Sequence, residues 1–196
     1  QIVFNHYSLS DKSTNVSIFG AFCTTQFYKK KGVSMKQAPY NPIDVANYIV
    51  WRANELGKPV THLKLQKLLY YVVAKFAKDN NALLINEDIV KWRYGPVVKS
   101  VYHQFKLFGD QEIDAPVSYL SDESNYSGEG KFIIKFADVK SINTGLHADN
   151  NLKDAVTHVL HTLGDSTAFE LVDRTHVEPA WRDFEDMIFQ NLEPHY

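Results

Sequence analysis

The chain has 196 residues, enough for one hydrophobic core of ordinary size. Hydrophobic residues make up 44% and charged residues 22%, which is typical of a folded globular protein and not of a disordered chain. A formal net charge of -2 provides no overall basic field for nucleic acid, so we expect no nucleic-acid partner. The single Cys23 excludes an internal disulfide and a Cys-rich zinc module. A single cysteine fits a reducing, cytoplasmic setting. No apolar run approaches the roughly 20 residues of a membrane helix, so we expect no membrane partner.

Residues 1–34 differ in texture from the rest of the chain. They alternate polar and β-favouring residues and end close to three consecutive lysines, and the first methionine is Met35. Two interpretations remain open: an added β-hairpin or arm, or an upstream leader before a natural start at Met35. We therefore divide the chain into an N-terminal extension, 1–34, and one helical domain, 35–196.

Two well-marked helices open the domain. Asn41 and Pro42 are a favourable entry to a helix that runs to about Leu56, where Gly57 ends it. Thr61 is a suitable cap for the second helix, 62–78, whose apolar residues recur every three or four positions along one face: Leu65, Leu68, Leu69, Val72, Val73 and Phe76. Only this apolar face is expected to be buried. We therefore expect the opposite, polar face of the helix to be exposed to solvent, and it carries Lys64, Gln66 and Lys67.

The segment after the second helix contains a rigid aromatic turn, residues 92–96. Residues 86–94 form a short helix or a strand, and Gly95 supplies a backbone conformation that other residues resist. Pro96 is expected to open a third helix that Gly109 ends. Trp92 and Tyr94 suit either a corner of the core or an interface, and the core is the simpler interpretation.

The second half of the domain alternates loop and helix. Residues 111–130 are rich in Ser, Asp, Glu and Gly and predict a surface loop, and 131–136 is the only well-marked strand. A helix follows over 152–163, then one capped by Ser166, then a final amphipathic segment from Pro179 with these apolar residues: Trp181, Phe184, Ile188 and Leu192. The expected fold class is mainly α, a single helical domain with a small β-strand or hairpin insertion.

Candidate chemistry is sparse. His158 and His161 lie one turn apart with Asp154 nearby, but on the wet side of their helix, so we expect no metal. His176 is more simply structural than catalytic. Because a nucleophile elbow and a phosphate loop are both missing from the sequence, we expect no cofactor and no enzyme activity.

Three motifs resemble one family. Residues 61–71 (THLKLQKLLYY), 92–97 (WRYGPV) and 171–176 (LVDRTH), with Pro179 and Trp181 after them, resemble the Panacea domain, also described as SocA-like and phage-associated. The resemblance covers about residues 42–184. It departs from the family pattern at Lys91 and Lys99, where small residues or Pro are commoner, and at Ala180, which separates Pro179 from Trp181.

The resemblance implies an antitoxin of a toxin–antitoxin module, which neutralises a cognate toxin by direct binding. The alternative is an adaptor that delivers the toxin to a protease, and a remote third is a hydrolase that uses His176. The sequence does not specify the oligomeric state. Candidate partner-binding residues come from the second helix and the aromatic turn: Lys64, Lys67, Trp92, Tyr94 and Tyr102.

Overall fold

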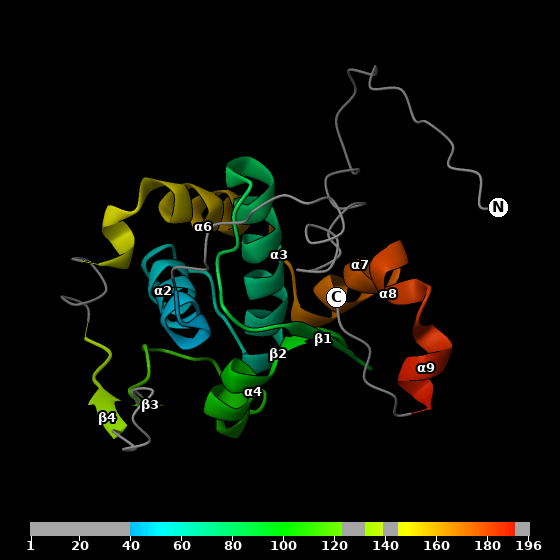
Figure 1. Ribbon diagram of the computed structural model, residues 1–196, viewed down its shortest axis with the longest axis horizontal. Coiled ribbons are helices and arrows are strands. Elements are labelled where there is room, and N and C mark those ends of the chain that lie inside the picture. The colour runs from blue at the N-terminus through cyan, green and yellow to red at the C-terminus, as the bar shows by residue number, and fades with distance from the viewer. Residues whose placement is uncertain (1–39, 123–131, 139–144, 191–196) are drawn as a thin grey trace, which may run out of the picture.

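Helix α3 (His62–Asn80) runs through the middle of the molecule, with α2, α6 and α7 packed around it (Figure 1). The computed structural model describes residues 40–122, 132–138 and 145–190. The expectation of a mainly α fold with small strand insertions is confirmed. The N-terminal extension, 1–34, and Leu192 lie outside the described residues.

The principal helices begin where polar side chains cap them. Asn41 accepts a hydrogen bond from the Ile43 amide at 2.8 Å at the start of α2 (Pro42–Glu55), and the predicted Thr61 cap opens α3. Asp149 caps α6 (Asn150–Leu163). The predicted cap of α7 (Ala168–His176) is one residue off, because Thr167, not Ser166, forms a reciprocal capping box with a glutamate in the first turn.

The aromatic turn lies in a β-hairpin and does not open a helix. Strand β1 (Ile89–Trp92) pairs antiparallel with β2 (Gly95–Val98), with Trp92 opposite Gly95 and a two-residue connection between the strands. Gly95 has a φ of 91°, as the turn requires. Helix α4 (Lys99–Phe105) begins only after the hairpin and continues into η1 (Lys106–Phe108). The expectation that Pro96 starts a helix is therefore wrong.

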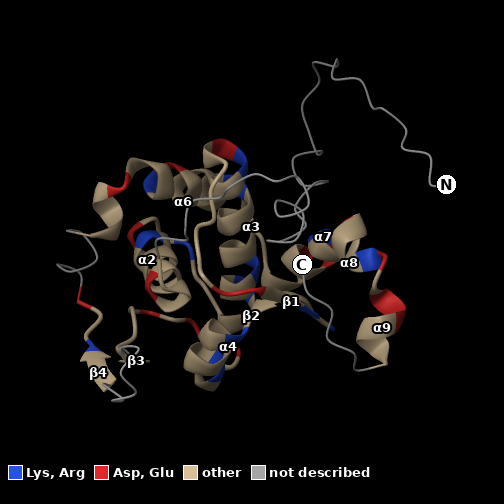
Figure 2. Ribbon diagram, in the orientation of Figure 1, with Lys and Arg blue, Asp and Glu red and all other residues tan. Residues whose placement is uncertain are grey.

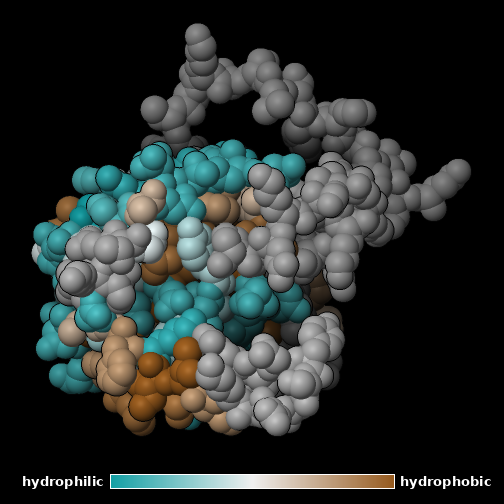
Figure 3. Space-filling model, turned by 60° about the vertical axis from the view of Figure 1, so that its left-hand side comes forward, coloured by the Kyte–Doolittle hydropathy of each residue, from teal (hydrophilic) through white to brown (hydrophobic). Residues whose placement is uncertain are grey.

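A second hairpin lies at the far side of α2. The predicted strand is confirmed as β4 (Phe132–Lys135), but it pairs with β3 (Tyr119–Asp122), which lies within the expected loop. One face of this hairpin is apolar and exposed through four side chains: Leu120, Phe132, Ile134 and Phe136. In Figure 3, brown hydrophobic atoms gather at the lower edge of the molecule, on the side of this hairpin.

The C-terminal part closes the other side of the molecule. After η2 (Leu146–Ala148) and α6, helix α7 leads into the short helices α8 (Pro179–Arg182) and α9 (Glu185–Phe189). Trp181 and Ile188 belong to the buried core, together with the predicted stripe of α3. None of the helices within the described part of the chain is long and apolar enough to span a bilayer.

Candidate partner-binding site

Lys64 fastens the start of α3 to the neighbouring loops. Its ammonium group donates to the carbonyl oxygens of Pro59 at 2.8 Å and Gly164 at 2.7 Å. Burial lowers the pKa of Lys64, an effect opposed by the nearby Asp165 carboxylate. A buried ammonium is tolerable only where acceptors replace water, and these two carbonyls do so.

Gln66 and Lys67 hold strand β2 against α3. The Gln66 side chain accepts from the Val98 amide at 2.9 Å and donates to the Val98 carbonyl, as a neighbouring strand would. The Lys67 ammonium donates to the Pro96 carbonyl at 2.9 Å. Lys67 is fully buried, and this burial lowers its pKa to about 7. The acceptor for Lys67, the Pro96 carbonyl, lies 29 residues further along the chain.

The expectation of a solvated polar face on α3 is wrong. Lys64 is 6% exposed and Lys67 0%, so neither ammonium group is accessible to a partner in this structure. The physical reason is that backbone carbonyls from three separate segments satisfy these side chains inside the protein. Both lysines therefore leave the candidate surface, and their role in the structure is to position β2 and the loop after α6.

The three sequence motifs meet at Gly95. A Cβ atom built there would lie 2.5 Å from Thr175 Oγ1 and 3.0 Å from Lys67 Nζ, too close for any side chain. Thr175 is itself buried and donates to the Val172 carbonyl at 2.8 Å. The glycine thus serves two purposes: it permits the positive φ, and it lets α3, the turn and α7 come into contact.

Trp181 and His176 support the turn from behind. The Trp181 indole donates to the Trp92 carbonyl at 3.0 Å, and the His176 ring stacks on Trp181 at 3.8 Å with an interplanar angle of 15°. Burial, with the Lys67 charge, lowers the pKa of His176, while Asp173 and a hydrogen bond to the Arg93 backbone oppose this. The Nε2 atom of His176 has no hydrogen-bond partner among the described residues, so a satisfied structural histidine stays a prediction.

A half-buried carboxylate joins α3 to the start of α8. Glu178 accepts hydrogen bonds from the hydroxyl groups of Tyr70 at 2.7 Å and Tyr71 at 3.0 Å. Burial raises the pKa of Glu178, and the two tyrosine hydrogen bonds oppose that shift. The sequence reading missed this contact, because the tyrosines and the acid lie more than 100 residues apart.

On its outer side the hairpin faces a pocket of about 350 Å³, the aromatic pocket. Tyr102, from α4, lies between two other rings: its centroid is 4.8 Å from that of Trp92, edge to face, and 5.0 Å from that of His62. The pocket is lined by residues from α3, the β1–β2 hairpin, α4 and α9: His62, Leu63, Gln66, Lys91, Trp92, Arg93, Tyr94, Val97, Tyr102 and Ile188.

The aromatic pocket brings together three of the five candidate residues. Trp92 and Tyr102 are half-buried and Tyr94 is 55% exposed, so their rings are at least partly available to a partner. The sequence reading missed His62 and Arg93, although both lie within the quoted motifs. Ile188 carries no local signal that could have found it. Whether a partner contacts these residues stays a prediction.

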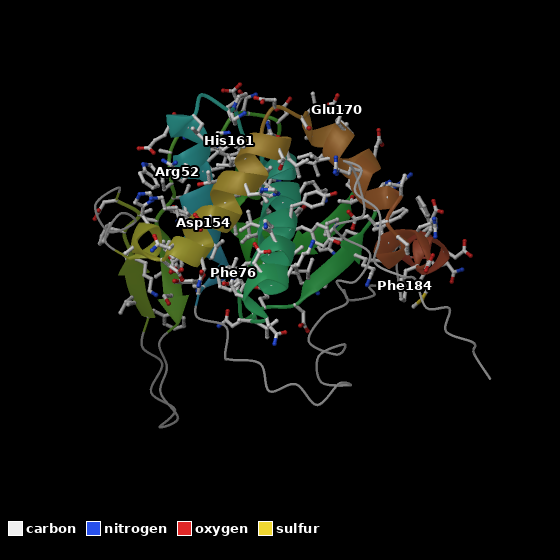
Figure 4. All side chains as sticks on the ribbon, turned by 90° about the horizontal axis from the view of Figure 1, so that it is seen from above. Arg52, Phe76, Asp154, His161, Glu170 and Phe184 are labelled. Atoms are coloured by element: carbon white, nitrogen blue, oxygen red, sulfur yellow. The ribbon has the colours of Figure 1, made fainter. Side chains whose placement is uncertain are left out.

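The three residues that the sequence suggested as possible metal ligands lie on α6. His161 and Asp154 lie exposed on α6 (Figure 4), as predicted, and so does His158. Among the residues that the structure describes, no group of three or more His, Cys, Asp or Glu side chains could hold a metal ion.

Basic and acidic residues are interspersed over the described elements (Figure 2).

Comparison with known proteins agrees with the motifs. Residues 65–182 match the family model described as "Antitoxin SocA-like, Panacea domain". The chain is 31% identical over 138 residues to "Antitoxin SocA" of Caulobacter vibrioides (strain NA1000 / CB15N), a match that covers 67% of this chain and 63% of that protein. The chain thus matches less than two thirds of that relative's length. No solved structure matches it.

Proposed function

We propose that this chain, which belongs to the SocA-like Panacea domain family, is the antitoxin of a toxin–antitoxin module and neutralises a cognate protein toxin by binding it directly. The activity comes from a surface and not from catalysis. We place the protein in the cytoplasm, as part of a module that phages can carry.

The aromatic pocket is the observation that carries this proposal. It is apolar, open to solvent and held rigidly, because Gln66, Lys67 and Trp181 all fix the backbone of the hairpin that forms it. Protein interfaces concentrate their binding energy in a few aromatic and Arg side chains placed in such surroundings. Trp92, Tyr94 and Tyr102 have that character, and Arg93 lies between the first two in sequence.

Co-expression with the toxin encoded beside this chain tests the proposal. Wild-type protein should restore growth while the amount of toxin, measured by immunoblot, stays constant. The two purified proteins should also form a complex in isothermal titration calorimetry. If growth is restored but the toxin disappears, and returns when the host protease is deleted, the chain is a proteolysis adaptor instead.

The hydrolase alternative is tested with the same purified proteins. Wild-type protein that protects cells without binding the toxin, and loses protection on His176→Ala while remaining folded, would support catalysis. We expect the opposite: a stable complex, and a His176→Ala variant that is impaired only as far as its folding is impaired.

A further inference from the structure

The walls of the aromatic pocket carry one sign of charge. Its lining contains two cations, Lys91 and Arg93, but no Asp or Glu among the residues that the structure describes there. The remaining walls are aromatic or aliphatic apart from one amide, that of Gln66, whose oxygen and nitrogen are both hydrogen-bonded to Val98. A ligand that fits these walls has an apolar body and a negative charge.

The two cations of the hairpin differ in what they can reach. The Lys91 side chain is 1% exposed, and its ammonium lies 4.5 Å from the centroid of the Phe184 ring, which comes from the segment between α8 and α9 (Figure 4). Arg93 is exposed, and its guanidinium lies over the Phe189 ring at 5.3 Å. Arg93 is therefore the cation placed to meet a charge from outside, because Lys91 is enclosed within the protein.

His62 belongs to the wall of the aromatic pocket, beside Tyr102. Its Nε2 atom is buried and has no hydrogen-bond partner among the described residues. Burial, with the Lys67 charge, lowers the pKa of His62. The imidazole therefore contributes its ring to the pocket wall beside Tyr102, and the charged contact is left to Arg93.

We propose that the aromatic pocket receives a short segment of the toxin that presents one aromatic or large aliphatic side chain next to an Asp or Glu. The side chain enters between Trp92, Tyr94 and Tyr102, and the carboxylate pairs with Arg93. The volume of about 350 Å³ lies at the lower end of ligand pockets, so one such side chain and its neighbour fill it. Naming the toxin as the source rests on the proposed function, but the chemistry of the pocket does not.

The chemistry can be tested without the toxin, with N-acetyl-tryptophan as the probe. This molecule carries an aromatic ring and one carboxylate, and N-acetyl-tryptophanamide is the same molecule without the charge. In an NMR titration of the full chain, N-acetyl-tryptophan should shift the Trp92 indole signal and the Tyr102 ring signals. It should bind roughly two- to fivefold more tightly than the amide, the range expected for an exposed ion pair.

Matched variants locate the charge and the ring. Arg93→Gln should remove the preference for the acid over the amide, whereas Arg182→Gln, at an exposed arginine on α8 beside Asp183, should keep it. Tyr94→Ala should weaken both probes, whereas Phe169→Ala, at a 65% exposed ring on α7, should weaken neither. Equal binding of acid and amide by the wild type, or no shift at Trp92 and Tyr102, would overturn the inference.

The toxin itself separates this inference from the proposed function. If the toxin binds wild type and the Arg93→Gln and Tyr94→Ala variants equally, the function stands and the pocket is not its site. If the toxin does not bind wild type at all, the proposed function fails, whatever the probe shows. If Tyr94→Ala converts a dimer of the free protein into a monomer in light scattering, the occupant is a second copy of the chain and the inference is wrong.

Discussion

The two faces of the β1–β2 hairpin use similar residue types for opposite purposes. Against the inner face, Lys67 of α3 is buried and donates its hydrogen bond to the backbone of β2. On the outer face, Arg93 and Tyr94 are exposed at the aromatic pocket. A cation or an aromatic ring within the motifs is therefore not by itself a contact residue. What decides its role is which side of the hairpin it faces.

The largest effect should come from reversing the charge on the inner face. Lys67→Glu places a carboxylate beside the Pro96 carbonyl, where two acceptors face each other out of water. We expect the free energy of unfolding to fall by more than about 3 kcal/mol, since an unpaired buried charge typically costs that much. Urea denaturation followed by circular dichroism measures the change. A stably folded Lys67→Glu protein would show that the side chain at position 67 is not buried between α3 and the hairpin.

The next largest effect should come from the apolar side of the same helix. Leu69 is 0% exposed, and Leu69→Ala should cost ~2–5 kcal/mol because a cavity replaces the lost methyl groups. Leu107→Ala is the matched control, because Leu107 is 90% exposed, and its change should stay within about 0.5 kcal/mol. A similar loss of unfolding free energy in the two variants would show that the apolar face of α3 is not part of the core.

A smaller effect concerns pH. Burial lowers the pKa of Lys67 from 10.5 to about 7, so between these values the unfolded chain binds more protons than the folded protein. Stability contributed by this group should therefore rise with pH above 7, by at most about 1.4 kcal/mol per pH unit. The measurement compares denaturation of wild type and Lys67→Met from pH 7 to 9. Lys67→Met should lack this part of the slope, and identical slopes would contradict a neutral lysine in the fold.

Local features of the fold could be predicted from the sequence, whereas contacts between distant segments could not. Caps such as Asn41 and Thr61 act on amides two or three residues away, so local reading finds them. The burial of Lys64 was not readable, because one of its acceptors, the Gly164 carbonyl, lies 100 residues away. Strand β2 was missed because Pro96 is also a common first residue of helices, and only the pairing with β1 decides between the two.

The candidate site was predicted in part for the same reason. Trp92, Tyr94 and Tyr102 were singled out as large, partly polar rings near a turn, and the structure places them around one pocket. Ile188 closes that pocket from a distant helix, and no local pattern could assign it there. Lys67 was named as a candidate and Arg93 was not, because the sequence alone does not distinguish an ammonium held by a carbonyl from a guanidinium at the surface.

The smallest effect on stability should accompany the largest effect on binding. Tyr94 is 55% exposed, so Tyr94→Ala should change the free energy of unfolding by less than about 0.5 kcal/mol. The same change should weaken the toxin complex by about 2 kcal/mol or more if Tyr94 anchors the interface. If Tyr94→Ala is destabilised as strongly as Leu69→Ala, the Tyr94 ring is part of the core and not of the exposed outer face of the hairpin.

The most direct test of the account is one calorimetric titration of the cognate toxin into three folded proteins: wild type, Tyr94→Ala and Phe169→Ala. Phe169 is a similarly exposed ring on another helix and controls for the loss of aromatic surface. We expect wild type and Phe169→Ala to bind with the same affinity, whereas Tyr94→Ala should bind roughly 30-fold or more weakly, which corresponds to about 2 kcal/mol. Equal affinity for all three proteins would contradict the claim that the outer face of the β1–β2 hairpin is the surface that binds the toxin.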